Sequence, residues 1–311
     1  MLATLPQIGP LQSASTFLQW FDIGGVCLQV RGNSSSDVYV GPELQPFRRQ
    51  PLPHGTEIDL DLEVTWVDEI ISRDKETNFE SGATWRLFNH GAEFEFEFTS
   101  PVFRYGPYKR LRVEHGFRHA EIILSRAARE HCGRIAPFEY PANELLITNY
   151  LASYGLGVEV HGCGVIDRET GGHLFLGHSG AGKSTTAKLW ESLRKPEILS
   201  DDRIILRLHD GELWMYGTPW HGEAAFASPA RAKLKWIHIL RHGRENKFTP
   251  VARSRAVGEI FARSFPPFHS PSGVGRTLDF INRALEIAPC YEFEFLPDGS
   301  SIAAVLESCS S

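Results

Sequence analysis

The sequence predicts a protein of the α/β (α+β) class, in which a mostly antiparallel β-rich part precedes a mixed α/β part. Three observations predict this. Apolar and acidic residues alternate with a period of two in the first third of the chain, which is typical of strands packed on one face. A glycine-rich motif follows an apolar strand and precedes a helix in the second half. The pattern of apolar and polar residues changes near residue 135, so we expect two domains, 1–135 and 136–311.

The region from about Phe17 to Arg126 is expected to consist of strands. Apolar and polar side chains alternate over residues 58–66, and glutamates alternate with phenylalanines over residues 93–98. The acidic residues are expected to form a solvated sheet face, and a surface for a basic partner is the alternative. We infer substrate selection for this domain, since it contains no recognisable catalytic constellation.

The start of the second domain is expected to be helical and then extended. Residues 141–154 have Pro141 near their start, an apolar stripe and Gly155 as a stop signal, which predicts one helix. Residues 158–166 form an apolar strand, and residues 167–172 turn into the next strand, 173–176.

The phosphate-binding loop is the strongest signal in the chain. The pattern G-x-x-x-x-G-K-[ST] spans Gly177 to Ser184, with strand before it and an apolar helical stripe after it, closed by Pro196. Glycines let successive N–H groups turn toward phosphate oxygens, and the helix N-terminus favours anions. The pattern predicts nucleotide binding by Gly177, His178, Ser179, Gly180, Ala181, Gly182, Lys183, Ser184 and Thr185. Lys183 would contact the outer phosphates and Ser184 would bind Mg²⁺.

The rest of the chain predicts a hairpin, further strands and three helices. A short strand at 197–200 ends in two aspartates, and an Asp-Gly pair joins strands 203–208 and 212–216. Further strands are expected at 234–240 and 291–295, and helices at 257–264, 276–287 and 300–307.

Several polar residues near the loop have both a catalytic and an ordinary interpretation. Asp201 and Asp202 could serve as the base and the Mg²⁺ ligand of a kinase, or could cap the hairpin and meet solvent. A lone histidine in an apolar strand, His161, is more often a core residue than a catalytic one. His221 and Glu223 lie two apart in a polar loop, where they could act as ligands.

A family resemblance favours the catalytic interpretation. His161-Gly162, the loop, and Leu-Ser-Asp-Asp-Arg at 199–203 resemble the catalytic domain of HPr kinase/phosphorylase and its relatives. Segments 217–223, 262–268 and 289–298 resemble HPr-kinase-related proteins of uncertain substrate. The resemblance implies a fold like that of ATP-dependent phosphoenolpyruvate carboxykinase for the second domain.

The resemblance also implies roles for individual residues. Asp201 would be the base for a serine hydroxyl, supported by His161, and Lys183 would neutralise the transferring phosphate. The resemblance assigns Ser184 and Asp202 to Mg²⁺, and Glu223 of the polar loop is the third candidate Mg²⁺ ligand.

Composition limits the partners. The formal net charge of −6 gives no electrostatic reason to expect nucleic acid or an anionic membrane surface. Five scattered cysteines indicate neither a disulfide framework nor a zinc site. The N-terminal residues lack the pattern of a secretion signal, and no apolar run is long enough for a membrane span. We expect a cytoplasmic protein, with a homo-oligomer left open.

The function expected from these residues is an ATP- and Mg²⁺-dependent kinase. Its acceptor would be a hydroxyl, in particular that of serine, in a protein, peptide or small molecule. The alternative is a nucleotide-binding regulatory or assembly protein without phosphotransfer. The intact pair Asp201-Asp202 argues against that alternative. A carboxykinase acting on oxaloacetate is a weaker third hypothesis, because the chain is short and no arginine-rich substrate motif is evident.

Overall fold

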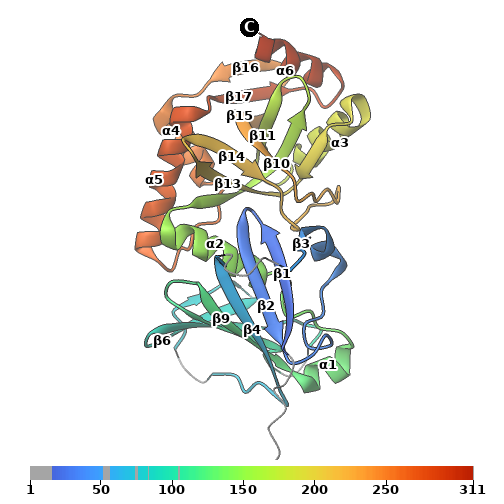
Figure 1. Ribbon diagram of the computed structural model, residues 1–311. Coiled ribbons are helices and arrows are strands. Elements are labelled where there is room, and N and C mark those ends of the chain that lie inside the picture. Colours follow the sequence, from blue (N-terminus) through green and yellow to red (C-terminus); the bar gives the residue numbers. More distant parts are fainter. Residues whose placement is uncertain (1–15, 52–56, 74–75, 83, 104–105, 311) are drawn as a thin grey trace, which may run out of the picture.

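The computed structural model describes residues 16–51, 57–73, 76–82, 84–103 and 106–310. They form a mixed α/β protein with two large sheets, one below the other in Figure 1, and several helices, most of which belong to the second half of the chain. Residues 1–15, on which the expectation about a secretion signal depends, lie outside the described part.

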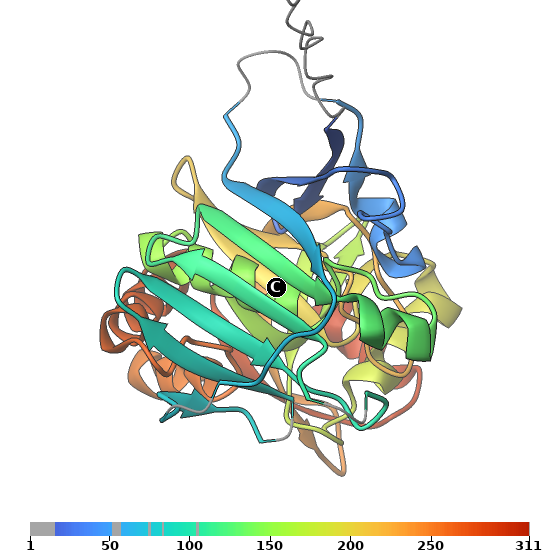
Figure 2. The same cartoon turned by 90° about the horizontal axis from the view of Figure 1, so that it is seen from below.

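The first sheet contains nine strands in the order β3-β1-β2-β4-β9-β8-β7-β6-β5. Their bounds are Phe17–Ile23 (β1), Val26–Gly32 (β2), Arg48–Arg49 (β3), Leu60–Val67 (β4), Phe79–Glu80 (β5), Trp85–His90 (β6), Glu93–Phe98 (β7), Lys109–Glu114 (β8) and His119–Ser125 (β9). Among the described strands of this sheet, only the pairs β2–β4 and β4–β9 are parallel. The sheet is therefore mostly antiparallel, as the alternating pattern predicts, and it curves when seen from below (Figure 2). A 3₁₀ helix (η1, Pro42–Phe47) and a short helix (α1, Arg126–Cys132) accompany it.

The acidic residues of β7 correct one expectation. Glu95 and Glu97 are only 2% and 0% exposed, so they do not form a solvated face. Glu95 pairs with Arg73 and Arg112, and both glutamates pair with Arg110 from the neighbouring strand β8. The solvated-face expectation was wrong here because arginines, one of them from the segment after β4, cover this face and neutralise it.

Helix α2 (Ala142–Tyr154) lies between the two sheets (Figure 1). It begins after Pro141 and ends at Gly155, whose left-handed conformation caps it, as the sequence predicts. Its buried side chains join the core of the first sheet, and this core continues to Ile205, Tyr216 and Trp220 of the second half. Apolar packing therefore crosses residue 135, and the two-domain division stays a prediction.

The second sheet contains β10 (Gly157–Asp167), β11 (Gly171–Leu176), β12 (Glu197–Ser200), β13 (Arg203–His209), β14 (Glu212–Tyr216), β15 (Arg231–His242), β16 (Lys247–Pro250) and β17 (Cys290–Phe295). The strand order is β11-β10-β13-β14-β15-β17-β16, with β12 beside β10. A further parallel pairing of β11 with β15 joins the ends of the path β11-β10-β13-β14-β15, so these five strands form a closed ring. The long strands β10 and β15 make this possible, because each pairs with different neighbours along its two halves.

Four helices accompany the second sheet. They are α3 (Lys183–Arg194), α4 (Arg253–Phe261), α5 (Pro271–Ile287) and α6 (Ser300–Ser310). Helix α5 starts earlier than the apolar pattern suggests, because Ser270 caps it through the Gly273 amide and Pro271 occupies its first turn. Within the described part of the chain, no helix is both long and apolar enough to cross a bilayer.

The tip of the β1–β2 hairpin contacts the second sheet. Gly24 and Gly25 have φ values of +63° and +70°, and Arg207 of β13 donates hydrogen bonds to both of their carbonyl oxygens. A Cβ at Gly24 would overlap the fully buried side chain of Ile205. Glycine is therefore needed here both for the turn and for the close approach of the two sheets.

Candidate functional site

The glycine-rich loop connects the end of β11 to the start of α3. Gly180 and Gly182 have φ values of +79° and +100°, which ordinary side chains rarely adopt. A Cβ at Gly182 would also lie 2.5 Å from the Phe295 ring of β17. Residues 178–180 are exposed, as is Thr185 on the first turn of α3. The tip of the loop is therefore exposed to solvent, whereas its last glycine, Gly182, packs closely against Phe295.

Lys183 is folded back over the loop. Its Nζ donates hydrogen bonds to the carbonyl oxygens of Gly177 (3.0 Å) and His178 (3.1 Å). Burial lowers its pKa, and the charges of Asp202 and Asp201 partly compensate. A phosphate at the loop would replace these carbonyl contacts with an ion pair, which stabilises the ammonium form.

Asp201 lies directly beside the first turn of α3. Its Oδ2 accepts a hydrogen bond from Ser184 Oγ at 3.0 Å. The same carboxylate accepts backbone hydrogen bonds from Gly222 and Ala224, each at 3.0 Å, and it is only 1% exposed. Asp201 is thus fixed in orientation, with the Ser184 hydroxyl as its side-chain partner.

Asp202 faces the opposite way, towards His161 of β10. His161 Nε2 lies 2.7 Å from Asp202 Oδ1, and Arg203 donates to Oδ2 at 2.6 Å. Burial alone would raise the pKa of Asp202, but the His161 hydrogen bond and the charges of Arg203 and Lys183 outweigh it and lower this pKa. Asp202 is therefore an ionised carboxylate at neutral pH.

The pairing expected from the resemblance, His161 with Asp201, is wrong. His161 lies opposite Arg203 in the β10–β13 register, and the Gly162 amide donates to the Asp202 carbonyl oxygen at 3.0 Å. This register places the histidine against the second aspartate of the turn. Ser184 correspondingly contacts Asp201 and not Asp202, with which we had expected it to share Mg²⁺.

The loop after β14 contributes backbone groups to the site. The side chains of His221 and Glu223 are exposed, and only the amides on either side of Glu223 contact Asp201. No group of three or more His, Cys, Asp or Glu side chains suited to a metal occurs in the described ranges. Ser184 and Asp201 are nevertheless an oxygen pair of the kind that Mg²⁺ uses together with phosphates and water.

Arg203 is the residue that sequence reasoning missed. Its guanidinium pairs with Asp202, with Glu144 of α2 (3.0 Å) and with Glu159 of β10 (3.1 Å), and it lies 4.1 Å from the centre of the Phe265 ring. Glu159 is completely buried, and burial together with the nearby Glu144 charge raises its pKa well above the ordinary value. Its position next to Asp201-Asp202 was the only signal, because its partners are distant in sequence.

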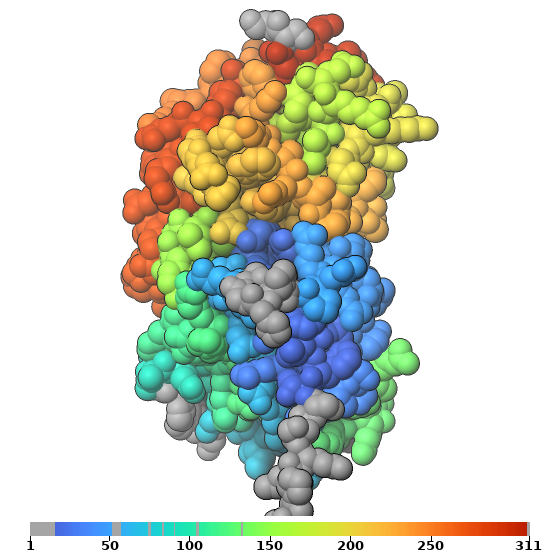
Figure 3. All heavy atoms as spheres, viewed as in Figure 1, coloured from blue at the N-terminus to red at the C-terminus, as the bar shows by residue number. Residues whose placement is uncertain are grey.

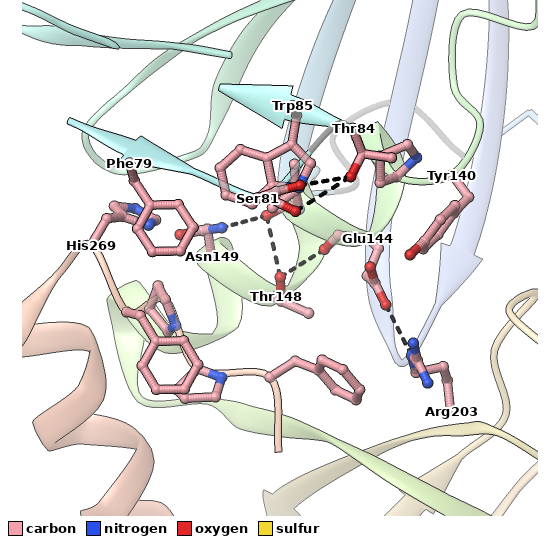
Figure 4. A pocket seen from close by; sticks show the side chains of 16 residues that line it. Phe79, Ser81, Thr84, Trp85, Tyr140, Glu144, Thr148, Asn149, Arg203 and His269 are labelled. Carbon is pink, nitrogen blue, oxygen red and sulfur yellow. Dashed lines mark hydrogen bonds and ion pairs between the residues drawn. The ribbon is translucent and has the colours of Figure 1, made fainter. Parts of the chain in front are cut away.

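Two cavities meet at Arg203. The first, about 440 Å³ and here called the base-side cavity, is lined by Glu43, Glu139, Tyr140, Asn143, Asp202, Arg203, Pro219, Trp220 and His221. The second, about 320 Å³ and here called the inter-sheet cavity, lies between β5–β6, α2 and residues 265–269 (Figure 4). Tyr140 and Arg203 line both. Both have walls from the first and the second half of the chain, whose surfaces adjoin in Figure 3.

Comparison with known proteins provides little information about this site. No protein-family model matches the chain, and no curated protein matches it. Among solved structures, the HPr(Ser) kinase/phosphatase from Coxiella burnetii aligns over 48% of this chain and 94% of its own, with 11% sequence identity and a TM-score of 0.28. A TM-score this low does not establish a shared fold, so the interpretation below rests on the site itself.

Proposed function

We propose that this protein is an ATP- and Mg²⁺-dependent kinase that transfers the γ-phosphate of ATP to a hydroxyl group, in particular that of serine. The observation that carries the proposal is the division of the two adjacent aspartates beside the phosphate loop. Asp201 contacts the loop serine, whereas Asp202 lines an open cavity. A kinase requires one carboxylate for the metal and another for the attacking hydroxyl.

Ser184 and Asp201 are the residues that would hold Mg²⁺, whose chemistry is to neutralise charge on the β- and γ-phosphates. Asp201 is aligned for this by two backbone amides, which leave its Oδ2 directed at Ser184. We assign the metal to Asp201 in place of Asp202, and Glu223 has no role in this assignment because its side chain is exposed.

Asp202 is assigned as the base in place of Asp201. It is partly exposed in the base-side cavity and held by His161 and Arg203, so it can accept a proton from a hydroxyl in that cavity. Lys183 would move from its two carbonyl contacts to the transferring phosphate and offset its charge. His161 acts through Asp202 and is a positioning residue.

A nucleotide-binding regulatory protein without phosphotransfer is the second candidate. It would need the loop and Lys183 but would not need an ionised carboxylate held by a histidine at an open cavity. That arrangement favours the kinase.

The proposal is tested by incubating the protein with γ-labelled ATP and Mg²⁺ in the presence of free serine, seryl peptides and candidate metabolites. Label should appear in an acceptor with the wild-type protein and be absent with Asp202→Asn. ATP binding without transfer to any acceptor would favour the regulatory alternative.

A further inference from the structure

Tyr140 and Arg203 line both the inter-sheet cavity and the base-side cavity, and Asp202 lines the latter. Arg203 bonds Asp202 with one nitrogen and Glu144, on the inter-sheet side, with another. A molecule that occupies the inter-sheet cavity therefore contacts the same guanidinium that holds the proposed base.

We propose that the inter-sheet cavity binds an aromatic ring of the phosphate acceptor, and that this ring carries a polar O–H or N–H group. The inference rests on the proposed function, because it places the acceptor hydroxyl at Asp202. The acceptor would therefore carry two groups on one molecule: a serine-like hydroxyl that receives the phosphate, and an aromatic ring with a polar group, such as a phenol.

The walls of the cavity suit a flat ring. Phe79 and Trp85 stack with centroids 5.4 Å apart on one side (Figure 4), and the loop Phe265-Pro266-Pro267-Phe268 contributes apolar groups. The volume of about 320 Å³ falls at the lower end of the range for small-molecule sites. Phe268 is 63% exposed, which leaves apolar surface at the rim for the ligand to cover.

The wall of the cavity also includes a histidine, His269, with an unpartnered ring nitrogen. His269 Nε2 is buried and makes no hydrogen bond within the described part of the protein. Its ring lies beside Phe79 and Asn149 in the cavity wall (Figure 4). A phenol O–H both donates and accepts, so it satisfies this nitrogen in either imidazole tautomer, whereas an unsubstituted ring leaves it unsatisfied.

We assign the aromatic ring in the cavity to the acceptor because of the residues that line the two ends of the cavity. His269 and Asn149 mark the end beside β5, and Tyr140, Glu144 and Arg203 mark the end that meets the base-side cavity. A ring at the first end leaves the attached chain to pass Arg203 towards Asp202. The first half of the chain then selects the acceptor through Phe79 and Trp85.

The first test measures binding of phenol and benzene to the full-length protein by saturation-transfer NMR. We expect phenol to bind about tenfold or more tightly than benzene, which can neither donate nor accept a hydrogen bond, and His269→Phe to remove the difference. Ser81→Trp should block the cavity, whereas Ser35→Trp, an exposed serine of the same half, should not. MgATP binding by each variant verifies folding.

Equal binding of phenol by the wild-type protein and a folded Ser81→Trp variant would overturn the cavity assignment. Lys183→Ala should bind phenol normally, so this measurement is independent of whether the protein is a kinase.

The second test measures transfer of γ-phosphate to the serine of Tyr-Ser amide and Ala-Ser amide. The aromatic acceptor should be preferred by about tenfold or more in kcat/KM, since the cavity buries its ring. Ser81→Trp should remove this preference and Ser35→Trp should keep it. Transfer to both acceptors at equal rates would overturn the inference and leave the proposed kinase function standing. Phenol binding without transfer to either acceptor would instead contradict the proposed transfer to a serine hydroxyl, and with it the assignment of the cavity to the acceptor.

Discussion

Ser184 Oγ and Asp201 Oδ2 are 3.0 Å apart, and this contact joins the phosphate loop to the strand that carries both aspartates. Asp201→Asn keeps the shape of the side chain but removes its charge. We expect this variant to need a Mg²⁺ concentration at least roughly tenfold higher for ATP binding, because a carboxylate ligand is lost. Titration of Mg²⁺ at fixed ATP measures the shift. An unchanged requirement would contradict the assignment of the metal to Asp201.

Asp202→Asn is expected to bind MgATP almost normally and to transfer phosphate about 10²- to 10⁴-fold more slowly, the usual effect of losing a general base. Single-turnover transfer from labelled ATP measures it. Because the His161 hydrogen bond and the Arg203 charge lower the pKa of Asp202, wild-type transfer should fall only in acid, at a pH below the ordinary range for an aspartate. A variant with near-normal turnover would show that another group takes the proton.

Lys183→Ala is expected to weaken ATP binding by at least about tenfold, because a charge-assisted contact to the phosphates is removed. Calorimetry with MgATP measures the affinity. Lys188→Ala is the matched control, since Lys188 is exposed on the same helix. If both variants bind ATP like the wild type, the loop is not the nucleotide site.

Glu95→Gln is expected to destabilise the protein by roughly 3 kcal/mol at neutral pH, because it removes the buried negative charge that pairs with Arg73, Arg110 and Arg112. Burial raises the pKa of Glu95, but the hydrogen bond from Arg73 and the charges and bonds of Arg110 and Arg112 lower it to about 2, from 4.5. The carboxylate therefore contributes its full stability above pH 4.5, and this stability is lost as the pH falls from 4.5 towards 2.

Urea unfolding at neutral pH and at about pH 3 tests whether this stability is lost on acidification. Glu95→Gln should lose less stability on acidification than the wild type. Glu93→Gln is the control, since Glu93 is exposed on the same strand and should change stability by less than about 0.5 kcal/mol. Equal acid sensitivity in all three proteins would contradict the prediction.

Gly24→Ala is expected to destabilise the contact between the two sheets by roughly 1–3 kcal/mol through overpacking against Ile205. Gly91→Ala shares the positive φ, +69°, but its Cβ would meet no atom within 4 Å. The difference in unfolding free energy between the two variants therefore isolates the overpacking from the backbone strain. Similar values for both would show that the Ile205 contact is unimportant.

Sequence reasoning predicted those features that depend on neighbouring residues. Strand β7, helix α2 and the glycine positions of the loop follow from local periodicity and backbone preference. The pairing of His161 with Asp202 depends instead on the β10–β13 register, which the sequence of neither strand specifies. The burial of Glu95 depends on Arg73, which arrives from outside the strand.

The inter-sheet cavity was not predictable for the same reason. Its walls come from residues near 80, 145 and 267, which only the folded chain brings together. Helix α1 was also missed, because its seven residues contain no apolar stripe and are fixed by the Ser125 cap.

The four-way contact of Arg203 has a consequence for how this protein diverges among species. Arg203 contacts Asp202, Glu144 and Glu159 at once and also lies over the Phe265 ring, and the compact ammonium of a lysine would not reproduce this set of contacts. Replacing it alone would leave Glu159 buried beside Glu144 with no counter-charge. Homologues are therefore expected to keep or lose this arginine and these two glutamates as a set, which an alignment would reveal as co-variation between positions 144, 159 and 203.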